Sequence, residues 1–73
     1  MFERYTLQSR IYSFTSKGRD FIYDVAYFGS LADAQSFGRK YVREFNLWHG
    51  DFHRLQSVTI ICGKKEFGLY GRH

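Results

Sequence analysis

The chain has 73 residues, a formal net charge of +4 at pH 7, and 15 aromatic side chains interleaved with 11 Lys and Arg. This length allows one domain over residues 1–73, and the single cysteine excludes an intramolecular disulfide, which fits a reducing compartment. The N-terminus lacks an apolar signal-peptide core, and no apolar run nears the about 20 residues of a membrane span. We therefore expect a cytoplasmic protein with no membrane partner.

The first part of the chain predicts a β-hairpin. Over residues 4–14 the apolar residues Tyr5, Leu7 and Ile11 share one face and polar residues share the other. Residues 21–28 form the second strand, with the aromatic residues 21, 23 and 27 on one face together with Val25. Between these strands a polar cluster around Gly18 predicts a turn, since glycine tolerates the positive φ of tight turns. On the second strand the alternation assigns Tyr27 to the core and Phe28 to the opposite face.

A single amphipathic helix is predicted next. Ser30 is a good N-cap residue, and Asp33 follows at a position where its charge suits the helix N-terminus. Gly50 is placed to end the helix. Apolar residues recur at spacings of three and four and form one stripe, which consists of Leu31, Ala34, Gly38, Tyr41, Phe45 and Trp48.

Two more strands complete the predicted domain. Residues 55–62 contain the β-branched run 58–61, which is typical of a central strand buried on both faces. Gly63 begins a short turn, and residues 66–71 form the last strand. The fold class is α+β with the order β-β-α-β-β. We expect a four-stranded, largely antiparallel sheet with one helix packed on one face, because one amphipathic helix covers only one side.

The sheet face without a helix is the first candidate binding site. Exposed aromatics beside arginines stack the bases of single-stranded nucleic acids, and the same residue types dominate protein-binding hot spots. Three interpretations are therefore open: nucleic-acid binding, protein binding and ordinary cross-strand packing. The absence of an RNP-type motif favours a protein partner over nucleic acid. We assign to this face Arg4, Gln8, Arg10, Tyr12, Phe28 and Tyr70. Periodicity assigns to the core Tyr5, Phe21, Tyr23, Tyr27, Tyr41, Phe45, Trp48 and Phe67.

The polar side of the helix is the second candidate. Arg39, Lys40 and Arg43 are neighbours on the helix surface, so these three cations could contact two or three phosphates with salt-dependent affinity. The alternative is a solvated surface on which Lys40 pairs with Glu44 at i,i+4.

Metal binding and catalysis are not predicted. His49 and His53, with Cys62 as a third ligand, have no second cysteine or clear fourth ligand beside them, and Gly50 breaks the helix between the two imidazoles. Cys62 belongs to an apolar strand, where a thiol usually behaves as a small hydrophobic group. The chain carries no complete phosphate-loop motif. We expect no cofactor, no metal and no enzymatic activity.

In size, composition and element order, the whole chain resembles small phage-encoded host-takeover proteins, which regulate host RNA polymerase or inhibit host defence. The resemblance implies a non-enzymatic regulatory adaptor that binds and modulates a larger host protein, such as RNA polymerase or a nuclease effector. It would act as a monomer or a homodimer, with the sheet face as anchor and the basic helix steering it to an acidic patch. The alternative function is direct binding of nucleic acid through the basic helix and the aromatic sheet face.

Overall fold

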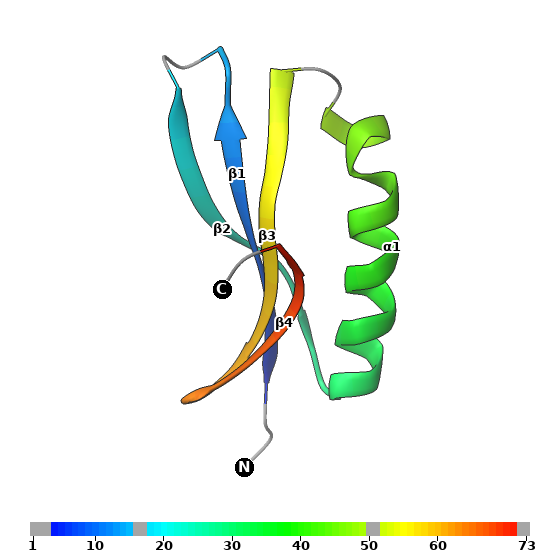
Figure 1. Cartoon of the computed structure of the whole chain (residues 1–73). Coiled ribbons are helices and arrows are strands. Elements are labelled where there is room, and N and C mark those ends of the chain that lie inside the picture. Colours follow the sequence, from blue (N-terminus) through cyan, green and yellow to red (C-terminus); the bar gives the residue numbers. More distant parts are fainter. Residues whose placement is uncertain (1–3, 16–17, 50–51, 72–73) are drawn as a thin grey trace.

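The computed structural model describes residues 4–15, 18–49 and 52–71, with only the backbone at positions 46, 48 and 49. Four strands and one helix follow in the predicted order: β1 (Tyr5–Ser13), β2 (Arg19–Phe28), α1 (Leu31–His49), β3 (His53–Cys62) and β4 (Lys65–Gly71). The strands form one antiparallel sheet, and α1 packs on one side of it (Figure 1). The predicted α+β fold is confirmed.

The strand order in the sheet is β2-β1-β3-β4, so β1 lies inside the sheet and β2 and β4 form its edges. Because β1 is antiparallel to both neighbours, β2 and β3 run in the same direction on either side of it. The helix α1 is the crossover that joins them. No helix among the described residues is long and apolar enough to cross a membrane.

The core lies between α1 and the two inner strands. The predicted helix stripe supplies Ala34, Tyr41 and Phe45, which are buried against four apolar strand residues. Those four are Leu7, Ile11, Val58 and Ile60. The helix begins as predicted, because the backbone amide of Asp33 donates to Ser30 Oγ at 3.2 Å. The predictions for the Trp48 side chain and for Gly50 lie outside the described residues.

Strand β3 is an inner strand, as its β-branched run predicted, but only one of its faces is fully buried. Val58 and Ile60 point under the helix and are buried, whereas Thr59 and Ile61 on the other side are partly exposed. Burial on both faces was therefore a wrong expectation, because a single helix leaves the second face of the sheet uncovered.

Gly38 allows α1 to approach the sheet closely. A Cβ built at this position would collide with the Leu69 side chain of β4 and would lie 3.1 Å from Leu7 Cδ1 on β1. The glycine therefore removes bulk at the point where the middle of the helix crosses two strands.

A chain of three hydroxyl groups runs under the helix from the edge of the core to its centre. The Tyr41 hydroxyl donates to Ser9 Oγ at 3.0 Å, and it lies 3.0 Å from the Tyr23 hydroxyl. Ser9 is completely buried, and its small side chain leaves room for the Tyr41 ring. Burial raises the pKa of Tyr23, and the hydrogen bond with Tyr41 raises it further.

A β-bulge in β2 reverses the sequence prediction for two aromatic residues. The pairing of β2 with β1 shifts register at Val25, which has no partner of its own on β1. Beyond the bulge, Phe28 lies on the face covered by the helix, where its ring centroid is 5.3 Å from that of Phe37. Tyr27 turns to the uncovered face and is 53% exposed. Assigning Phe28 to the uncovered face and Tyr27 to the core was wrong, because strict alternation takes no account of an extra residue.

Candidate binding surfaces

The sheet surface turned away from α1 is named the open face. It is formed by side chains that alternate with the buried ones on all four strands. Four of the six predicted residues lie on it: Arg4, Gln8, Arg10 and Tyr12. A register shift at Leu69 sets Tyr70 opposite the buried Val58, so the pairing assigns Tyr70 to the helix side of β4, although this residue also borders the trough described below. Phe28 lies on the helix side as well, for the reason given above. Whether these residues bind a partner stays a prediction.

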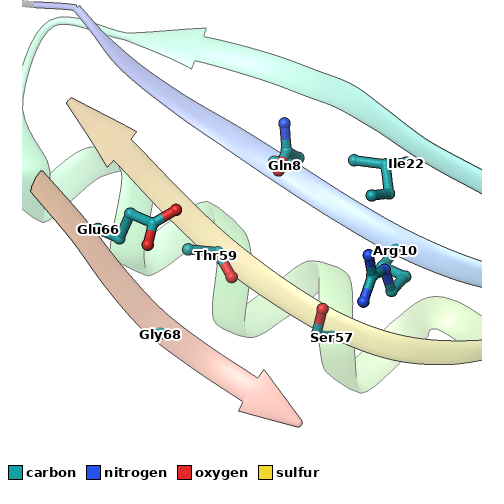
Figure 2. Close-up of a pocket in the computed structure, with 7 residues that line it drawn as sticks. All are labelled: Gln8, Arg10, Ile22, Ser57, Thr59, Glu66 and Gly68. Carbon is teal, nitrogen blue, oxygen red and sulfur yellow. The ribbon is translucent and has the colours of Figure 1, made fainter. Parts of the chain in front are cut away.

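A shallow trough crosses the middle of the open face. Its first part has a volume of about 380 Å³, and Figure 2 shows the residues that line it on all four strands. The short side chains of Ser57 and Thr59 on β3 and the bare backbone of Gly68 on β4 give it depth. A second part of about 540 Å³ shares Arg10 and Ser57 with the first and reaches Tyr70. The exposed Arg10 side chain therefore lines both parts.

The charges of the open face are balanced and ordered by strand. The described cations come from the inner strands and their flanking residues: Arg4, Arg10 and Arg54. The described carboxylates come from the two edge strands: Asp20, Asp24 and Glu66. The face therefore presents a positive middle between two negative borders rather than a uniformly basic surface.

One group of side chains on the open face is held together by polar contacts. The Asp24 carboxylate accepts hydrogen bonds from the Tyr27 hydroxyl at 3.0 Å and from Gln8 Nε2 at 3.5 Å. The guanidinium of Arg4 lies over the Tyr27 ring, 4.6 Å from its centroid. The hydrogen bond to Asp24 raises the pKa of Tyr27, and the charge of Arg4 opposes this shift. These contacts connect exposed side chains of β1 and β2 with one another.

A second group lies at the far end of β1 and includes a residue that the sequence analysis missed. The Arg54 guanidinium lies 5.3 Å from the centroid of the Tyr12 ring and 5.9 Å from that of Phe14. The two rings meet edge to face with centroids 5.2 Å apart. Arg54 was left out of the sequence analysis because the strand expected there began at residue 55. Its place opposite Tyr12 follows only from the pairing of β1 with β3.

The basic side of α1 forms a separate surface. Arg39, Lys40 and Arg43 are exposed and line one groove of about 740 Å³, which the Phe28 and Phe37 rings also line. Within the described part of the chain no ion pair joins Lys40 to Glu44, and Glu44 Oε2 is buried without a hydrogen-bond partner there. The three cations therefore lie together on one exposed surface of α1, and whether they bind a ligand stays a prediction.

No group of three or more His, Cys, Asp or Glu side chains suited to a metal ion occurs among the described residues. The side chains of His49 and Asp51 lie outside that description. Cys62 is a partly exposed free thiol at the end of β3.

Comparisons of the chain with protein-family models, with curated proteins and with solved structures found no match. The kind of partner is therefore inferred from the chemistry of the two surfaces.

Proposed function

We propose that this protein is a non-enzymatic adaptor that binds a larger protein through its open face and modulates it. The observation that carries the proposal is the balanced, ordered charge of a sheet face that no helix covers. Nucleic acids require an excess of cations at the contact, because each phosphate contact exchanges a counterion for a Lys or Arg. A face with carboxylates along both borders suits a protein surface of complementary pattern.

The side chains of the open face are of the kind that anchor protein interfaces. Arginine and tyrosine are enriched among hot-spot residues, and Arg10 and Tyr70 stand exposed beside the trough. The Asp24 group is already ordered by its own hydrogen bonds, which lowers the entropy lost on binding. The resemblance to phage-encoded host-takeover proteins favours host RNA polymerase or a nuclease effector as this partner.

The test compares two variants of opposite surfaces in nuclease-treated host lysate. Arg10→Ala/Tyr70→Ala, named the open-face variant, removes the two exposed side chains that border the trough, and Arg39→Ala/Lys40→Ala/Arg43→Ala serves as the matched control on the helix. We expect wild type and the helix variant to retain the same stoichiometric partner. Loss of two hot spots of about 1 kcal/mol each should weaken binding of that purified partner at least about 30-fold in the open-face variant.

Thermal melts of both variants establish that they are folded. Equal retention of the partner by the open-face variant would refute the proposal. Capture that disappears with nuclease would also refute it.

Direct nucleic-acid binding is the second candidate, and the groove that gathers Arg39, Lys40 and Arg43 favours it. Fluorescence anisotropy with labelled single-stranded oligonucleotides between 50 and 200 mM salt tests it. We expect affinity to fall linearly on a log–log plot, and the slope to shrink by about 1.4 when Arg39 and Arg43 become Ala. No binding at the lowest salt concentration would eliminate this function.

A further inference from the structure

The outer edge of β2 has the properties of a strand-binding site. Among the described strands, β2 pairs only with β1, so the backbone groups on its other edge have no strand partner. Every residue from Arg19 to Asp24 is exposed, including Phe21 at 42%, Ile22 at 52% and Tyr23 at 38%. Natural proteins protect edges with prolines, lysines or bulges, and the bulge at Val25 lies beyond this stretch. The stretch 19–24 thus exposes three apolar residues between charged ones, and no proline, lysine or bulge blocks its edge.

An apolar hollow adjoins this edge on the side of the sheet that carries the helix. It has a volume of about 310 Å³ and is lined by Ile11, Phe21, Ile22, Tyr23 and His53. In Figure 1 the helix stands beside β3, while β2 lies at the opposite border of the sheet. Phe21 and Tyr23 were expected in the core. They lie on the helix side of the sheet, as expected, but the helix does not extend far enough over β2 to bury them. The hollow is wide enough to take one large apolar side chain.

The other side of the same edge is acidic. Asp20 and Asp24 flank Ile22 on the open face, four residues apart. Gln56 Nε2 lies 3.4 Å from Asp20 Oδ1, and the carboxylates retain further acceptor sites. A strand added at this edge would place its own side chains directly beside the two carboxylates, where cations stabilise the pair and anions destabilise it.

The charge pattern disfavours a second copy of this chain as the occupant. An antiparallel pair of β2 edges in one continuous sheet keeps side chains of the same face opposite each other. Centred on Ile22, such a pair sets Asp20 against Asp24 of the copy at two places. Centred on Phe21 or Tyr23, it sets a carboxylate against Ile22. Each register near the exposed stretch therefore opposes like charges or sets a charge against an apolar side chain.

We propose that residues 19–24 bind an extended segment of a partner protein as a fifth strand of the sheet. On the helix side the segment inserts an aromatic or large aliphatic residue into the apolar hollow, and on the open face it presents Lys or Arg to Asp20 and Asp24. Main-chain hydrogen bonds supply affinity, and the alternating side chains supply specificity. This inference goes beyond binding through the open face and does not require it.

The test uses a synthetic nine-residue peptide that alternates lysine or threonine with valine or phenylalanine, titrated into the ¹⁵N-labelled full chain. The expected result is saturable binding, with slowed hydrogen exchange at the outward amides of β2. One control peptide has glutamate in place of each lysine, and another carries N-methyl groups on its pairing edge. We expect each control to bind at least about tenfold more weakly.

Variants of the protein then assign the contacts. Asp20→Lys should reverse the preference and favour the glutamate peptide, because the charge at the edge is reversed. Arg39→Ala/Lys40→Ala/Arg43→Ala should leave the peptide affinity unchanged, because the groove that these residues line includes none of residues 19–24. The peptide titration reports on the β2 edge and the lysate capture on the open face, so failure of this inference is distinguished from failure of the open-face proposal. Absence of binding at millimolar peptide, or equal binding of all three peptides, would overturn the inference. Sedimentation showing a dimer with β2 amides already protected would overturn it as well.

Discussion

The hydroxyl chain under the helix predicts the energetic cost of removing a single oxygen atom. Tyr41→Phe deletes the group that donates to Ser9 Oγ and contacts the Tyr23 hydroxyl, both at 3.0 Å. Because Ser9 is fully buried, its hydroxyl loses this donor in a place that water does not reach, which costs about 1–3 kcal/mol. The Tyr23 hydroxyl is closer to solvent and adds little. We expect the free energy of unfolding to fall by about 2 kcal/mol, which lowers Tm by about 8–16 °C in a domain of this size.

Urea denaturation followed by circular dichroism measures this change, and a double-mutant cycle with Ser9→Ala isolates the contact. Removal of both partners should cost less than the sum of the single changes by about 1 kcal/mol or more. Tyr70→Phe is the matched control, since that tyrosine is exposed, and the free energy of unfolding of this variant should stay within about 0.5 kcal/mol of wild type. An additive cycle, or a Tyr41→Phe protein as stable as wild type, would refute the reasoning.

Three further predictions concern the packing and titration of the sheet. Gly38→Ala should lower the free energy of unfolding, measured by urea denaturation, by about 1 kcal/mol, because overpacking against Leu69 outweighs the higher helix propensity of alanine. In a Leu69→Ala background the same substitution should stabilise the protein, because the side chain that it meets is removed. Phe28→Ala should lower the free energy of unfolding by about 2–3 kcal/mol, and Tyr27→Ala should lower it by less than about 1 kcal/mol. The opposite order would contradict the faces that the bulge gives to these two residues. Because the pKa of Tyr23 is raised in the folded state, its contribution to stability is complete below pH 10 and falls as the pH rises further. Between pH 9 and 12 the free energy of unfolding should therefore fall less steeply for Tyr23→Phe than for wild type. The difference between the two slopes should stay below about 1.4 kcal/mol per pH unit, because Tyr23 is partly exposed and solvent screens its charge.

The element order could be predicted because each element carries a local signal. The helix stripe from Leu31 to Phe45 and the Ser30 cap are contained within one stretch of sequence. Gly18 and Gly63 take positive φ values of 73° and 61°, as expected for turns that need glycine. The strand bounds differ from expectation by one or two residues, since the ends of β2 and β3 carry polar residues that do not interrupt pairing.

The strand order and the membership of the open face could not be predicted, because both depend on pairing between distant residues. Alternation places Arg10 and Tyr12 correctly, since β1 itself has no extra residue. It fails at Phe28, because one unpaired residue at Val25 exchanges the faces of all that follows. Arg54 joins the open face only through its position opposite Tyr12, a relation between residues 42 positions apart.

The inner position of β1 has a consequence for how the chain reaches its folded state. The first strand to be synthesised finds one neighbour in the adjacent hairpin, but its second neighbour arrives only after the whole helix, as in the pair formed by Thr6 and Ile61. Until then the apolar side of the hairpin can pack only against α1, without Val58 and Ile60 of β3, and a two-stranded hairpin alone is at best marginally stable. Closing this long loop comes before most of the favourable burial, so folding is expected to be a single cooperative step limited by the docking of β3 beside β1. A ribosome-bound chain that has released only the hairpin and the helix should remain sensitive to protease.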